Sequence, residues 1–92
     1  MYYVYVLFSF KDRKLYIGFT ANLKKRVSLH LLGEVESTKL RLPLQLIYYE
    51  AYLDKQDAKG REKFLKGGSG HKFLKKQLRH LWQKLEFNYV PA

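Results

Sequence analysis

Cysteine is absent from this chain of 92 residues, so the sequence offers no disulfide, no thiolate metal ligand and no thiol nucleophile. No apolar run approaches the roughly 18 residues of a membrane span, and the tyrosine-rich stretch before Lys11 lacks the basic start of a secretory signal. A chain of this length is expected to fold as one domain around a small core. We therefore expect a cytoplasmic, single-domain protein that does not enter a membrane.

Acidic residues are scarce. Eight Asp and Glu stand against eighteen Lys and Arg, and the resulting formal net charge of +10 favours binding to a polyanion. No acid occurs between Lys63 and Lys84, where lysines recur at helical spacing. A helix face needed only for solubility usually mixes both signs of charge, so this basic face favours nucleic-acid phosphates over the alternative of a solvated surface.

Hydrophobic patterning predicts three strands and three helices. The strands are expected at residues 2–8, 14–19 and 44–50, and the helices at residues 22–32, at 54–66 and around Leu74 to Leu85. Residues 34–43 are expected to form a surface loop, and the glycine-rich residues 67–70 to break the chain. The order ββαβαα predicts an α+β domain over residues 1–82, with a tail at residues 83–92.

Three side chains lie at unusual places on the predicted helices. Arg26 and His30 flank the first apolar stripe at the edge between core and solvent, and Glu62 interrupts the second stripe. The two stripes are Leu23, Val27 and Leu31, and Ala58 and Leu65. Thr20 or Asn22 is available as the N-cap of the first helix, and Asp54 as the cap of the second.

Alternation along the first two strands places tyrosines on a common face. Tyr3, Tyr5 and Leu7 share one face, and Tyr16 shares a face with Gly18, so Tyr5 and Tyr16 are expected to meet. Taken singly, each candidate has an ordinary explanation: a strand tyrosine, a surface arginine, a histidine at a helix end, or a glutamate paired one turn along its helix.

Together these residues closely resemble the GIY-YIG nuclease family, over about residues 2–80. Tyr3-Val4-Tyr5 stands at the first family triplet, Tyr16-Ile17-Gly18 is the second triplet intact, and Asn22-Leu23-Lys24-Lys25-Arg26 leads to the family's arginine. The remaining matches are Arg26-x-x-x-His30-x-x-Gly33, Leu46-Ile47-Tyr48-Tyr49-Glu50 and Ala58-x-x-Arg61-Glu62-x-x-Leu65-Lys66. The set is similar to the small, single-domain, YhbQ-like members of the family.

The resemblance implies a three-stranded antiparallel sheet flanked by helices and an endonuclease that hydrolyses phosphodiester bonds. Glu62 would ligate one Mg²⁺ or Mn²⁺ ion, and Arg26 would stabilise the charge of the transition state. Tyr5 would bind or deprotonate the attacking water with help from Tyr16, and His30 would serve as a proton acceptor. Which of these groups is the general base stays open.

The resemblance also has departures. Tyr3 replaces the first family glycine, and no asparagine follows Glu62 at about a dozen residues, where Lys72 or Lys75 would have to take its role. We expect an enzyme that nicks DNA with low sequence specificity, including structured or damaged DNA in repair, with an unidentified protein partner able to add specificity. The alternatives are a weak or inactive nucleic-acid-binding module and an RNA-directed nuclease. The expected nucleic-acid contacts are Lys24, Lys25, Lys39, Arg41, Lys66, Lys72, Lys75, Lys76 and Arg79.

Overall fold

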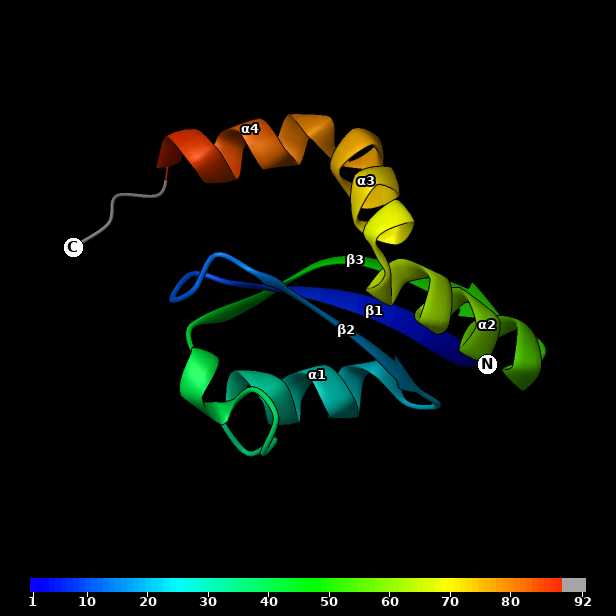
Figure 1. Cartoon of the computed structure of the whole chain (residues 1–92). Helices are drawn as coiled ribbons and strands as arrows, with labels where there is room; N and C mark the ends of the chain where they lie inside the picture. Colours follow the sequence, from blue (N-terminus) through cyan, green and yellow to red (C-terminus); the bar gives the residue numbers. More distant parts are fainter. Residues whose placement is uncertain (89–92) are drawn as a thin grey trace. The chain divides into compact units, whose positions relative to one another are not determined.

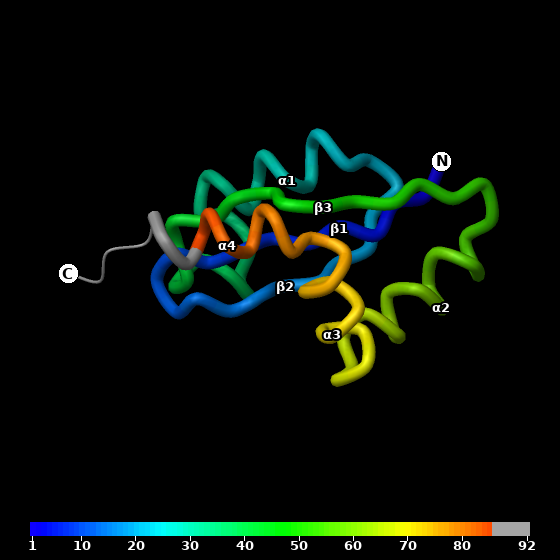
Figure 2. Tube along the Cα trace, turned by 90° about the horizontal axis from the view of Figure 1, so that it is seen from above, coloured from blue at the N-terminus to red at the C-terminus, as the bar shows by residue number. Residues whose placement is uncertain are grey.

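Three antiparallel strands form the sheet of the protein's computed structural model, which describes the backbone of residues 1–88 and the side chains of residues 1–85. β1 (Tyr2–Ser9) runs between β2 (Leu15–Thr20) and β3 (Leu44–Tyr52), as Figure 2 shows. The side chains of β1 are buried without interruption from Val4 onward, which indicates that both faces of this strand are covered. The prediction of an α+β fold with an antiparallel sheet is confirmed.

The pairing of β1 with its two neighbours fixes which side chains face each other. Tyr5 pairs with Gly18 of β2 on one side and with Tyr49 of β3 on the other. Leu7 pairs with Tyr16, so the rings of Tyr5 and Tyr16 are diagonal neighbours on the same face of the hairpin. The register against β3 shifts between Val6 and Leu7, a local irregularity of the bulge type.

Helix α1 (Leu23–Leu31) covers the face of the sheet that carries Tyr5 (Figure 1). Asn22 begins it as the N-cap, because its side chain accepts a hydrogen bond from the Lys25 N–H. The predicted apolar stripe is partly wrong, since Leu31 is 47% exposed and His30 is buried in its place. The position of His30 at a solvent edge is therefore also wrong; two buried hydrogen bonds satisfy its ring nitrogens inside the fold.

The segment between α1 and β3 was expected on the surface, and this is wrong for two of its residues. Val35 and Thr38 are buried, and a short 3₁₀ helix, η1 (Lys39–Arg41), follows them. The segment is anchored to the hairpin, because Ser9 Oγ donates to the Arg41 carbonyl at 2.6 Å and the Arg41 guanidinium binds Asp12. These contacts hold the segment against the sheet.

Helix α2 (Lys55–Lys66) follows β3, and its first turn is capped by the Asp54 carboxylate, which accepts from the Gln56 N–H at 2.8 Å. Ala58 and Leu65 are fully buried, as the predicted stripe requires, and Glu62 is half-buried. 

The Glu50 carboxylate on β3 connects α2 to the sheet by accepting several hydrogen bonds. Arg61 donates from Nε and Nη2 to the two carboxylate oxygens of Glu50, at 2.9 and 3.0 Å. Tyr48 and Tyr52 each donate a further hydrogen bond to Glu50 at 2.6 Å. Glu62 comes directly after Arg61, so this network also holds the turn of α2 that carries Glu62.

The chain divides into two compact units, residues 1–62 and the residues from Lys63 onward. In the second unit, α3 (Gly68–Gln77) and α4 (Arg79–Asn88) replace the single helix that was predicted (Figure 1). The backbone leaves the helical region at Leu78, and at the start of α3 only Gly67 stays outside the helix, so residues 68–70 do not form the expected break. Residues 83–88 of the expected tail belong to α4, and residues 89–92 lie outside the described part. None of the described helices is long and apolar enough to cross a membrane.

Candidate active site

Tyr5 lies at the centre of the candidate site, and Gly18 makes room for it. A Cβ atom built on Gly18 would overlap the Tyr5 ring and hydroxyl, so only glycine lets the phenol lie over β2. The Tyr5 ring is 6.3 Å from the Tyr16 ring, centroid to centroid. The prediction that Tyr5 and Tyr16 lie close together is therefore confirmed.

The buried imidazole of His30 connects two hydroxyl groups. Its Nε2 is 2.7 Å from the Tyr5 hydroxyl, and its Nδ1 is 2.7 Å from Thr38 Oγ1. His30 and Thr38 are fully buried and Tyr5 is 1% exposed. Both distances are short hydrogen bonds, so the three side chains form one continuous chain of proton donors and acceptors.

Burial, and to a smaller extent the neighbouring charges, sets the protonation of this chain. Burial raises the pKa of the Tyr5 phenol to about 12, and the Arg26 guanidinium opposes this rise. The neighbouring Tyr16 and Glu62 add to the rise. Burial, together with the charge of Arg26, lowers the pKa of His30 to about 4. At neutral pH the phenol is therefore protonated and the imidazole is neutral.

Tyr16 accepts a hydrogen bond from Ser37, which lies in the segment before η1. Its ring centroid is 5.0 Å from that of His30, and Ser37 Oγ donates to the Tyr16 hydroxyl at 3.3 Å. Two consecutive residues, Ser37 and Thr38, thus contact two of the predicted catalytic side chains. Neither residue was predicted as part of the site, because serine and threonine in a polar loop carry no periodic signal.

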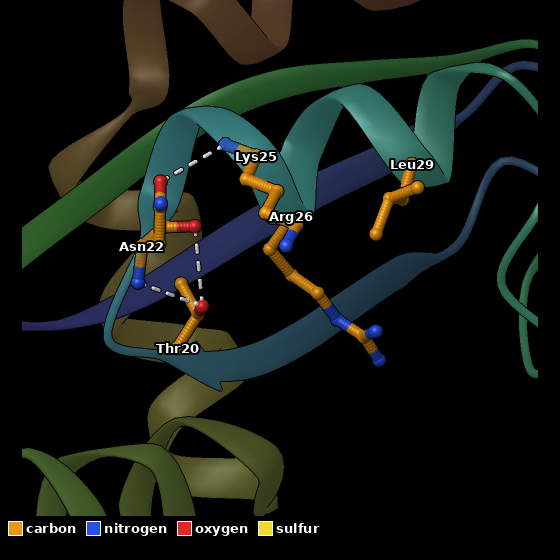
Figure 3. A pocket seen from close by; sticks show the side chains of 5 residues that line it. All are labelled: Thr20, Asn22, Lys25, Arg26 and Leu29. Atoms are coloured by element: carbon orange, nitrogen blue, oxygen red, sulfur yellow. Dashed lines mark hydrogen bonds between the residues drawn. The ribbon is translucent and has the colours of Figure 1, made fainter.

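Arg26 extends from α1 at the rim of an open pocket (Figure 3). The pocket has a volume of about 200 Å³ and is lined by Thr20, Asn22, Lys25, Arg26 and Leu29. Tyr5 lies close enough for the charges of Arg26 and Glu62 to shift its pKa. Among the five predicted catalytic residues, Tyr5, Tyr16 and His30 thus contact one another, and Arg26 and Glu62 act on the Tyr5 phenol through their charges.

Glu62 is the predicted metal ligand, and its donor chemistry fits a hard divalent cation. Glu62 as a whole residue is half-buried. No group of three or more His, Asp or Glu side chains that could hold a metal occurs in the described part of the chain. An ion here would thus have one protein ligand and take its other oxygens from water and substrate, as Mg²⁺ commonly does.

The basic side chains predicted to bind nucleic acid differ in their surroundings. Two have acidic partners: Lys39 Nζ is 3.0 Å from the Glu36 carboxylate, and Arg41 Nε is 2.6 Å from the Asp12 carboxylate. The pair with Arg41 lowers the pKa of Asp12 to about 2. Exposed side chains among the predicted contacts include Lys24 and Lys25 on α1, Lys66 on α2, and Lys72, Lys75, Lys76 and Arg79 in the second unit.

Comparison with known proteins identifies the family. A family model described as the GIY-YIG catalytic domain matches residues 1–77. The chain therefore belongs to the GIY-YIG nuclease family, whose members are endonucleases that generally depend on a divalent metal. 

Within this family the chain is similar to small UPF0213 proteins, as the YhbQ-like resemblance predicted. It is 42% identical over 77 residues to the UPF0213 protein in the ldhD 5′ region of Pediococcus acidilactici, covering 80% of this chain and 78% of that one. A UPF0213 protein of Clostridium perfringens is 42% identical over 67 residues, which are 72% of this chain and 71% of the relative. No solved structure matches the chain.

Proposed function

We propose that this protein is a metal-dependent endonuclease that nicks DNA with low sequence specificity. One observation carries the proposal: a buried phenol, Tyr5, is hydrogen-bonded to His30 and lies under the influence of the charges of Arg26 and Glu62. Phosphodiester hydrolysis needs a group that orients the attacking water, a fixed cation for the phosphate and a carboxylate for the metal. This arrangement supplies all three.

Tyr5 is the group that would orient the attacking water. Its hydroxyl hydrogen-bonds with His30, and its ring occupies the space that Gly18 leaves open on β2. As the water oxygen bonds to phosphorus and the opposite P–O bond breaks, the water would pass its proton to the Tyr5 oxygen while the phenol passes its own proton to Nε2 of the neutral His30 imidazole. Tyr16 has its hydroxyl oriented by Ser37 and would help to hold the water or the phosphate. Either Tyr5 or His30 would act as the base.

Arg26 would hold the phosphate during attack. A guanidinium stays charged and matches two phosphate oxygens at once, which suits it to the negative charge of the transition state. The pocket beside it adds Lys25 and the Thr20 hydroxyl, which would receive a neighbouring part of the substrate strand.

Glu62 would hold one Mg²⁺ or Mn²⁺ ion. When bound, the cation offsets negative charge on the phosphate and on the leaving oxygen. The carboxylate is well suited to this role because the Glu50–Arg61 pair fixes its turn of α2.

The substrate class follows from charge. The exposed lysines bind phosphates without reading bases, which favours low sequence specificity. We propose DNA, with structured or damaged sites in repair as the preferred targets and a protein partner as the source of further specificity.

The proposal is tested by single-turnover cutting of supercoiled plasmid, branched DNA and single-stranded RNA with Mg²⁺ or Mn²⁺. Tyr5→Phe should lower the cutting rate at least about a hundredfold, because the hydroxyl that orients the water is lost. Tyr49→Phe is the matched control, since Tyr49 pairs with Tyr5 in the sheet but is 53% exposed. Cutting of RNA alone would replace DNA as the substrate, and binding without any cutting would favour a nucleic-acid-binding module.

A further inference from the structure

Trp82 on α4 is the single tryptophan of the chain, and it lies beside cations of the second unit. The ammonium of Lys75 on α3 lies 5.9 Å from the centre of the Trp82 ring. Arg79 precedes Trp82 by three residues on α4, so the two side chains lie on the same side of that helix. The second unit thus presents an aromatic ring together with positive charge.

The bend between α3 and α4 helps to bring Lys75 to the tryptophan. At Leu78 the backbone leaves the helical region, and the two helices run in different directions (Figure 1). Helical hydrogen bonding resumes where the Trp82 N–H donates to the Leu78 carbonyl at 2.8 Å. On a straight helix, residues seven apart are separated by about 10 Å along the axis. The bend and the long lysine side chain together close this separation.

Trp82 is not a core residue of its unit. Among the described residues of this unit, the buried apolar side chains are Leu65, Leu74 and Leu85. Trp82 as a whole residue is half-buried, so part of it stays in contact with water. Tryptophan is common at binding interfaces, because its flat ring offers a large apolar area to a partner. The exposed part of Trp82 is therefore available for a ligand to cover.

The charge around Trp82 has one sign. No acid occurs between Lys63 and Lys84, and Lys76 is a further exposed cation in the last turn of α3. Arg79 places its charge at the positive end of the α4 dipole, an arrangement that a bound anion would stabilise. A polyanion with flat groups fits this surface, which is the chemistry of single-stranded nucleic acid. In a duplex, by contrast, the bases are already stacked on one another.

We propose that Trp82 and the cations beside it form a binding surface for single-stranded DNA. An unpaired base stacks on the indole, and neighbouring phosphates bind Lys75, Lys76 and Arg79. At 5.9 Å the Lys75 ammonium is near the outer limit of about 6 Å for a cation–π contact, so it is held weakly and can turn to a phosphate. Stacking accepts every base, which agrees with low sequence specificity.

Stacking is measured by the fluorescence of Trp82 in the full chain, since no other tryptophan contributes. Titration with a thymidine oligonucleotide should quench the emission, because a base stacks on the indole. Polyphosphate carries the charge without bases, so it should bind with little quenching. Binding of a labelled oligonucleotide, followed by its anisotropy, without quenching of Trp82 would overturn the proposal. Equal quenching by polyphosphate would also overturn it.

Substitution of the ring tests its share of the affinity. Trp82→Leu should weaken oligonucleotide binding about tenfold, whereas Trp82→Phe keeps a ring and should retain most of the affinity. Phe64→Leu is the matched control, because Phe64 is an aromatic residue of the same unit that is 42% exposed. An equal loss of affinity in folded Trp82→Leu and Phe64→Leu would contradict the proposal. If Trp82→Leu fails to fold, the quenching of the wild type decides.

The consequence for cutting rests on the proposed function, so it is read separately. Branched and damaged DNA exposes unpaired bases, so the wild type should nick a duplex with an unpaired loop at a lower KM than an intact duplex. Trp82→Leu should raise the KM for the looped substrate about tenfold with kcat unchanged. An unchanged KM would overturn the role of this surface in substrate choice. Absence of nicking by the wild type would instead count against the nuclease, while the quenching would still decide whether a base stacks.

Discussion

The buried neutral imidazole of His30 should make folding stability depend on pH in a defined window. Its pKa falls from 6.5 to about 4 on folding, so between these values the unfolded chain binds a proton that the folded chain does not. Stability from this group is complete above pH 6.5 and is lost as the pH falls toward 4. At about 1.36 kcal/mol per unit of pKa, the loss amounts to about 3 kcal/mol.

His30→Gln removes the titrating group and keeps a side chain that can hydrogen-bond to Tyr5. Urea unfolding of both proteins at steps between pH 7 and pH 4 gives two curves of unfolding free energy against pH. The variant is expected to be less stable at pH 7, but its curve should be flatter than that of the wild type by about 3 kcal/mol. Parallel curves would refute the reasoning, because the other titrating groups are common to both proteins.

Further predictions concern packing, the α2 anchor and the basic face. Gly18→Ala should destabilise the fold by about 1–3 kcal/mol, because the new methyl group overlaps Tyr5. Gly60→Ala should stabilise it by up to about 1 kcal/mol in thermal unfolding, since no atom lies within 4 Å of the added carbon. Glu50→Gln should destabilise by about 1–3 kcal/mol, whereas Glu36→Gln, in an exposed ion pair, should change the denaturation midpoint little. The basic face is tested by changing four of its residues together to glutamine: Lys72, Lys75, Lys76 and Arg79. The plot of log K for DNA binding against log salt concentration should become shallower by about 0.9 per lost phosphate contact. An unchanged slope would count against this face as the DNA-binding surface.

Regular periodicity made much of the fold predictable. Alternation along the hairpin correctly brought Tyr5 and Tyr16 together, and the stripe on α2 correctly placed Ala58 and Leu65 in the core. These predictions need only the geometry of a strand or a helix, which is local. The antiparallel arrangement of the sheet was predicted from the resemblance to the family.

The errors arose where tertiary contacts decide the outcome. His30 displaces Leu31 from the core because both of its ring nitrogens find buried partners, which a helical stripe does not reveal. Thr38 is buried because Ser9 and Asp12 hold the following turn, an effect of residues about thirty positions away. The bend at Leu78 has no Gly or Pro to announce it, so the last helix reads as continuous in the sequence.

The central claim, a metal-dependent nuclease centred on the Tyr5 site, is tested most directly by comparing cutting with binding. The wild type, Glu62→Gln and Arg26→Ala would be assayed for nicking of supercoiled plasmid with Mg²⁺ or Mn²⁺, with an EDTA control, and for binding to the same DNA. We predict metal-dependent nicking by the wild type that is lost in both variants while binding is retained. Nicking that survives in Glu62→Gln, or tight binding by the wild type without cutting of DNA or RNA, would contradict the account.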